Sequence, residues 1–127
     1  MKNEKQFLHS NSLMKENILK EKSYAFAKDI IWCYKNLTDQ QKEYVLSKQL
    51  LRSWTAIWAC IREAEFAQSK SDFIHKLSIS LKEANETIYR LELLHDTSIS
   101  IHTYDEIKQS CEELIKLLVK SIKTAKS

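Results

Sequence analysis

The chain of 127 residues contains no glycine and no proline. Average usage of about 7% glycine and about 5% proline would give a chain of this length about fifteen of the two. Glycine supplies the positive φ angles of tight hairpin turns and allows the close backbone approach of phosphate-binding loops. Its absence argues against β-hairpins, P-loops and Rossmann turns, and favours long helices joined by short polar segments.

Long apolar runs are missing as well. None approaches the roughly 20 residues that cross a bilayer, and the first stretch, MKNEKQFLHSNSLMKEN, has no apolar segment typical of a signal peptide. The three cysteines, Cys33, Cys60 and Cys111, are odd in number and widely spaced, which does not fit a disulfide framework. We therefore expect a cytoplasmic protein that does not associate with membranes.

What the chain does contain is 43% hydrophobic and 29% charged residues, arranged with helical periodicity. Four amphipathic helices are predicted at about 13–36, 39–68, 70–95 and 103–124. The polar residues 1–12 are predicted to form a flexible arm before a single domain, 13–127. Helix starts are indicated at Thr38-Asp39-Gln40-Gln41, Ser69-Lys70-Ser71-Asp72 and Thr103-Tyr104-Asp105-Glu106. Because short joints force neighbours to be antiparallel, we predict an all-α, up-down-up-down four-helix bundle.

The second predicted helix has an unusually wide apolar face. Trp54 and Trp58 share a stripe with other large apolar residues, and small side chains flank it. This position favours burial of both tryptophans over exposed base stacking, either within one subunit or between subunits. The surplus apolar width predicts self-association; the alternative is a wide core face covered by the N-terminal arm. The candidate interface residues are Ser53, Trp54, Ala56, Trp58, Cys60, Ile79, Tyr89 and Leu93.

Residues with catalytic or metal-binding potential are few. Asp72 and His75 form one D-x-x-H pair, whereas carboxylate-bridged di-iron bundles need two such motifs and two further glutamates. The remaining histidines fall in the arm or near the last loop. Cys60 and Cys111 fall on apolar or small-residue faces, where we expect buried core residues, and neither has a sequence-local basic partner that would activate a thiolate. The environment of Cys33 is left open. We therefore predict no catalytic residues, no metal and no cofactor, and a protein that is not an enzyme.

The net charge is only +3, but cations recur on two helices. Lys48, Arg52 and Arg62 share one side of the second predicted helix. The last helix carries Lys116, Lys120 and Lys123, with no acidic residue after Glu113. These six residues are the candidate nucleic-acid-binding set. The lysines of the last helix also complement its C-terminal dipole, which is a purely structural alternative.

Most of the chain, residues 23–95 above all, resembles the four-helix-bundle family of 23S rRNA intervening-sequence proteins. The resemblance lies in SYAFAKDII, EYVLSKQLLRS and IREAEFAQSKSDFIHKLSISLKEANETIYRLELL. The matching positions are Arg52, Ser53, Glu63, Ala64, Ser69, Asp72, Phe73, Lys82, Glu83, Ala84, Glu86 and Thr87. It implies an up-and-down bundle assembled as a ring-like homopentamer, with no catalytic residues to carry over. A related group engages nucleic acid and reverse transcriptase in diversity-generating retroelements.

Three positions depart from the family pattern. Trp54 and Trp58 stand where the family usually has glycine or another small residue, and Arg90 stands where it often has an aromatic one. Two indole side chains at these positions leave open how many subunits form the ring-like oligomer. We predict a non-enzymatic, self-associating bundle that binds nucleic acid, RNA in particular, or acts as a scaffold. The alternative is an adaptor that binds only a partner protein.

Overall fold

The computed structural model describes the backbone of residues 4–97 and 104–127 and the side chains of residues 18–97 and 104–127. The backbone forms four helices, α1 (Glu4–Asp39), α2 (Val45–Glu65), α3 (Lys70–Asp96) and α4 (Tyr104–Lys126), and these ranges contain no strand. The prediction of an all-α chain with four helices is therefore confirmed. None of these helices, in the part of the chain described, is both long and apolar enough to cross a membrane.

The first helix begins at Glu4 rather than at Leu13, so the predicted arm is helical from Glu4 onward. Residues 1–3 of that arm lie outside the described residues. The difference has a local cause, because a polar sequence without glycine or proline contains nothing that stops a helix.

The predicted helix start at Thr38 is wrong. The Thr38 hydroxyl donates a hydrogen bond of 2.9 Å to the Tyr34 carbonyl inside α1, which continues to Asp39. The chain then reverses through Lys42, whose φ of 54° lies in the left-handed region that glycine would normally occupy. Since the chain has no glycine, a lysine takes this position, and α2 starts only at Val45.

The start of α2 is capped by the Glu43 carboxylate. It accepts hydrogen bonds from the backbone N–H groups of Val45 at 3.0 Å, Leu46 at 2.9 Å and Ser47 at 2.8 Å. These are donors that the helix itself leaves without partners. Burial alone would raise the pKa of Glu43, but the hydrogen bonds from Leu46, Ser47 and Val45 together lower it below its ordinary value.

The start predicted for α3 is confirmed. The Ser69 hydroxyl accepts a hydrogen bond of 3.0 Å from the Asp72 N–H, and the Asp72 carboxylate accepts one of 3.4 Å from the Gln68 N–H. The preceding helix ends at Glu65, earlier than the predicted Gln68. The Thr103 cap predicted for α4 lies outside the described residues.

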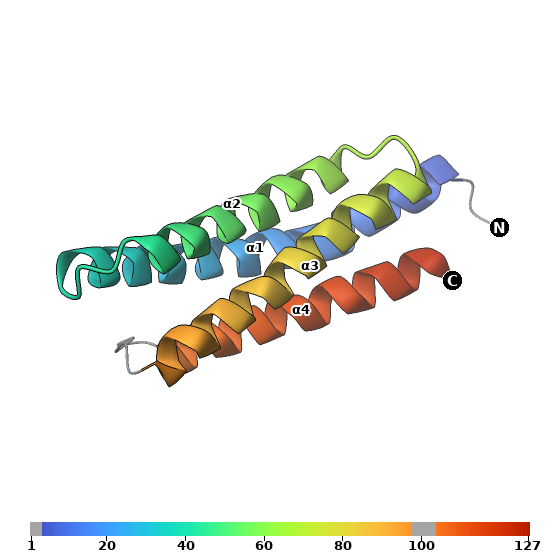
Figure 1. Ribbon diagram of the computed structural model, residues 1–127. Helices are drawn as coiled ribbons and strands as arrows, with labels where there is room; N and C mark the ends of the chain where they lie inside the picture. The colour runs from blue at the N-terminus through green and yellow to red at the C-terminus, as the bar shows by residue number, and fades with distance from the viewer. Residues whose placement is uncertain (1–3, 98–103) are drawn as a thin grey trace.

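Figure 1 shows the path of the chain: each helix runs in the direction opposite to the one before it, and both termini lie at the same end. Both α1 and α3 pack against α2 and α4, whereas α2 and α4 make no contact among the described residues. The helices therefore follow one another around the bundle in chain order, with α2 diagonally opposite α4.

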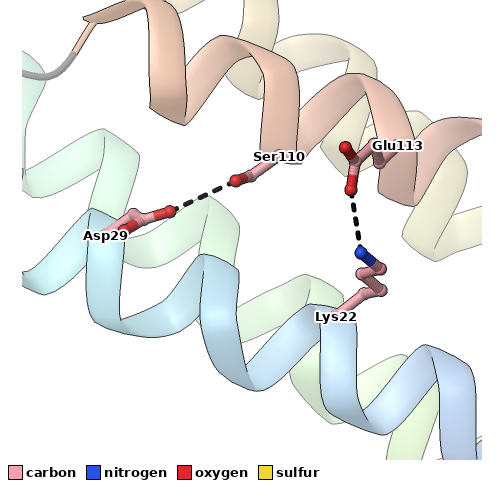
Figure 2. A network of polar contacts seen from close by, with 4 residues as sticks. All are labelled: Lys22, Asp29, Ser110 and Glu113. Atoms are coloured by element: carbon pink, nitrogen blue, oxygen red, sulfur yellow. Dashed lines mark hydrogen bonds and ion pairs between the residues drawn. The ribbon is translucent and has the colours of Figure 1, made fainter.

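Each neighbouring pair of helices is joined by one described ion pair. These are Lys20–Glu65 between α1 and α2, Glu63–Lys76 between α2 and α3, Glu92–Lys108 between α3 and α4, and Lys22–Glu113 between α1 and α4. Figure 2 shows the last of these at 3.0 Å, beside a hydrogen bond of 3.2 Å from the Ser110 hydroxyl to the Asp29 carboxylate. Ion pairs at or near the surface add little stability, but they show which residues of neighbouring helices lie side by side.

The core consists of aliphatic side chains from all four helices and one phenylalanine each from α1 and α3. The apolar stripe of α4 is buried from Ile107 to Ile122, with Tyr104 at its margin. The core face of α3 includes the buried Phe73 and Leu77. These stripes define the outer faces of the helices, which carry the charged residues considered next.

Candidate nucleic-acid interface

The three predicted cations of α2, Lys48, Arg52 and Arg62, are all exposed. None of them forms an ion pair with a described residue. The Arg62 guanidinium instead lies over the Trp58 ring, with 5.7 Å between Cζ and the ring centroid. These charges are therefore available to a ligand.

The α4 cations, Lys116, Lys120 and Lys123, are also exposed and lie on the side of α4 opposite its buried stripe. Within the described residues none of the three is engaged in an ion pair. Glu112 lies on the same outer side of α4 near Lys116, so the net positive part of this face is the C-terminal half.

The two groups of cations do not form one patch in a single subunit. Because α2 and α4 are diagonally opposite, their outer faces point to opposite sides of the bundle. A single nucleic-acid strand in contact with one face of a subunit would not reach the other. One subunit therefore offers a ligand two separate basic faces on opposite sides of the bundle.

The structure places two predicted interface residues inside the subunit. Ser53 and Cys60 are buried, and the Ser53 hydroxyl accepts a hydrogen bond from the Arg90 guanidinium of α3. They face α3, and the α2–α3 contact uses small side chains from both helices. One of these is Ser80 of α3, whose hydroxyl donates a hydrogen bond of 3.1 Å to the Ile57 carbonyl of α2. Within the subunit both side chains are therefore used in the contact with α3, although Ser53 also lines a recess between the two helices.

The two tryptophans differ in their surroundings. Trp54 is half-buried and packs against the core of its own subunit, so part of the wide apolar face of α2 is used internally. Among the described residues, its indole N–H has no hydrogen-bond partner. Trp58 is also half-buried but lies at the surface beside Arg62. Ala56, half-buried, lines a recess between α2 and α3.

The predicted interface residues of α3 lie on its outer surface. Tyr89 is 67% exposed and Leu93 is 39% exposed, while Ile79 is half-buried. Large apolar side chains at such exposures are the part of the predicted self-association surface that the subunit itself leaves uncovered.

A recess of about 180 Å³ between α2 and α3 was not predicted from the sequence. Its charged walls are Arg52 of α2 and Glu83, Glu86 and Arg90 of α3, and Arg90 Nη2 lies 3.7 Å from Glu86 Oε2. Two arginines opposite two glutamates give no net charge, so the recess does not favour phosphate. The sequence held one indication of this recess: Arg52, Ser53, Glu83 and Glu86, which line it, all belong to the positions that match the family pattern.

The other reactive groups do not converge. Within the described residues no group of three histidine, cysteine or acidic side chains is placed to hold a metal ion. Asp72 caps α3 and His75 is exposed, so their D-x-x-H spacing serves the helix start. His95 stacks on Tyr104 at 4.0 Å between ring centroids. The side chains of His9 and His102 lie outside the described residues.

All three cysteines are buried and free, as predicted for Cys60 and Cys111 and left open for Cys33. Burial raises the pKa of Cys33 to about 11, and burial with the nearby Glu112 charge raises that of Cys111 to about 12. Burial and the Glu63 charge also raise the pKa of Cys60. The thiolate that a nucleophile or metal ligand requires is therefore disfavoured at all three positions.

Comparison with known proteins agrees with the resemblance seen in the sequence. The chain is 55% identical, with a TM-score of 0.82, to a protein of unknown function from the S23 ribosomal protein family of Bacteroides thetaiotaomicron, whose crystal structure was determined at 1.70 Å resolution. The similarity covers 87% of this chain and 99% of that one. No curated protein matches the chain significantly. Residues 15–120 match the family described as 23S rRNA-intervening sequence protein, and the chain belongs to that family.

Proposed function

We propose that the protein is a non-enzymatic, cytoplasmic helical bundle that self-associates and binds RNA through the basic outer faces of α2 and α4. The observation that supports this most directly is the exposure of all six predicted cations without a described acidic partner. Phosphates of a nucleic acid are the polyanion that repeated, exposed lysine and arginine side chains bind best. Membership in a family named for intervening sequences of 23S rRNA agrees with an RNA ligand.

Self-association would bring basic faces from several subunits to one ligand. The outer side of α3, with Tyr89 and Leu93 exposed, supports an interface there. The resemblance to the family favours a ring-like homopentamer of up-down-up-down bundles, and the alternating helix directions of Figure 1 support that topology. In a ring, each modest basic face is repeated around the axis, which raises the affinity for a long polyanion.

The test is filter binding of a labelled RNA over a range of salt concentrations. The affinity should fall as salt rises, and neutralising three phosphate contacts should reduce the slope of log K against log salt by about 2. We compare Lys48→Gln/Arg52→Gln/Arg62→Gln with Lys116→Gln/Lys120→Gln/Lys123→Gln, which remove equal charge from opposite sides of the bundle. No binding by the unaltered protein at low salt would reject the proposal.

An adaptor that binds a partner protein instead is the alternative that the exposed apolar residues of α3 favour. A pull-down of the tagged chain from its native extract, performed with and without nuclease, separates the two. A partner that is lost after nuclease treatment supports RNA. A partner that survives nuclease, together with no RNA binding by the purified protein, supports the adaptor.

A further inference from the structure

The outer edge of the α1–α2 contact carries aromatic and aliphatic side chains among its cations. On α1, Tyr24, Lys28, Ile31 and Lys35 are all exposed and follow one another at spacings of four, three and four, so they form one stripe. On α2, an equivalent stripe contains Lys48, Leu51, Thr55, Trp58 and Arg62. The α1 stripe alternates cations with an aromatic and an aliphatic side chain, and the α2 stripe has a cation at each end with Leu51, Thr55 and Trp58 between them.

The two stripes lie side by side. Lys20 continues the α1 stripe one turn before Tyr24, and Glu65 continues the α2 stripe one turn after Arg62; their ion pair of 2.7 Å ties the stripes together at that end. Because α1 and α2 are antiparallel neighbours (Figure 1), counting from this pair sets Tyr24 near Arg62, Lys28 near Trp58 and Lys35 near Leu51, about one turn from Lys48. At 1.5 Å per residue the shared surface from Tyr24 to Lys35 is about 16 Å long.

Both aromatic rings of this surface are paired with a cation. Lys28 Nζ lies 5.1 Å from the centroid of the Tyr24 ring, and Arg62 lies over the Trp58 ring. Tyr24 is 63% exposed, so most of its ring is available for contact. The acids of this edge are Glu65, which is bonded to Lys20, and the exposed Glu21 and Asp39, so the four cations Lys28, Lys35, Lys48 and Arg62 outnumber the two exposed carboxylates.

We propose that this α1–α2 surface binds single-stranded nucleic acid, with bases stacked on Tyr24 and Trp58 and phosphates held by Lys28, Lys35, Lys48 and Arg62. The inference rests on the proposed RNA-binding function and names the form of RNA and the surface that binds it. Interleaved aromatic rings and cations suit a single strand, because its bases are free to stack, whereas a duplex offers its phosphates but not its base faces.

The test compares a 12-nucleotide oligouridine with an RNA hairpin duplex of equal phosphate content, both labelled for anisotropy. The unaltered protein should prefer the single strand. Tyr24→Leu should weaken oligouridine binding about tenfold without changing the salt slope, because it removes a stacking ring and no charge. Tyr44→Leu is the matched control: that tyrosine is 55% exposed but precedes α2 outside the two stripes, and its replacement should change the affinity less than twofold.

A second readout is independent of affinity. In a Trp32→Phe/Trp54→Phe variant Trp58 is the remaining tryptophan, and its fluorescence should be quenched by oligouridine but not by the duplex. Equal affinity for the two RNAs, with no effect of Tyr24→Leu, would overturn this surface while leaving the proposed RNA binding intact. Absence of binding to either RNA at low salt would instead reject both.

Discussion

The Glu43 carboxylate shows how one side chain determines where a helix begins. It bonds to three successive N–H groups at the start of α2, whereas the Tyr44 side chain makes no capping bond. Its negative charge also lies at the positive end of the helix dipole. Replacing this carboxylate by a neutral group should therefore weaken the first turn of α2.

Glu43→Gln should lower the free energy of unfolding by about 1 kcal/mol near pH 7, measured by urea denaturation. The pKa of Glu43 is lowered in the folded state, so its contribution is fully present above the unfolded pKa and is lost as pH falls through the folded pKa. The difference between the two proteins should therefore shrink as the pH falls below the ordinary glutamate pKa and disappear below the lowered folded-state pKa.

The control is Glu112→Gln, which neutralises an exposed carboxylate on the outer side of α4. It should change stability by less than about 0.5 kcal/mol. A Glu43→Gln effect that is equally large at low pH would show that the carboxylate charge is not what stabilises α2.

Trp54 and Trp58 show which part of a residue's environment the sequence determines. Their shared stripe predicted burial of both, and in the subunit both are half-buried. The stripe did not reveal that Trp54 packs on its own core while Trp58 borders the surface under Arg62. That difference depends on how α1 lies beside α2, and the spacing of residues within α2 alone cannot predict it.

At the scale of helices, the most extensive contact is between α2 and α3, where small side chains face one another. Ser53 and Cys60 of α2 and Ser80 and Thr87 of α3 are all buried. Small residues let the two backbones come close enough for the Ser80 hydroxyl to reach the Ile57 carbonyl. The apolar and small residues of α2 thus serve a subunit-internal contact that the sequence had led us to assign in part to self-association.

Ser80→Leu should destabilise the bundle by about 2–3 kcal/mol, because a larger side chain overpacks this contact and removes a buried hydrogen bond. Ser80→Ala, which only removes the hydrogen bond, should cost about 1 kcal/mol. Thermal and urea unfolding measure both. Ser78→Leu is the control two residues away, on the exposed side of α3; a cost there equal to that of Ser80→Leu would contradict the close α2–α3 contact.

The helices were predictable because an 11-residue window of apolar spacing carries enough information to identify them. Their ends were less so: the Thr38 sequence matches a capping box, but its hydroxyl bonds back into α1, and Glu43 does the capping from the turn. The cations of the candidate site were also visible in the sequence. Their separation onto opposite sides was not, because it follows from the order in which four helices pack.

At the scale of the whole molecule, the separation of its basic faces gives self-association a functional consequence. One subunit presents the α2 and α4 cations in opposite directions. A symmetric assembly repeats each face and lets one RNA contact several subunits, which increases avidity without any new contact. Binding of a long RNA should therefore depend on the oligomer more strongly than binding of a short oligonucleotide.

Light scattering after gel filtration at micromolar concentration should show an oligomer of the unaltered protein, and the homopentamer we propose has five times the subunit mass of 15.0 kDa. Tyr89→Glu/Leu93→Glu places two charges on the exposed apolar side of α3 and should give a helical monomer, because an unpaired buried charge is costly at an interface. Val45→Glu, at an exposed position at the start of α2, should leave the assembly unchanged. A monomeric unaltered protein would refute self-association. An oligomer that resists the double substitution would place its interface on a face other than that of α3.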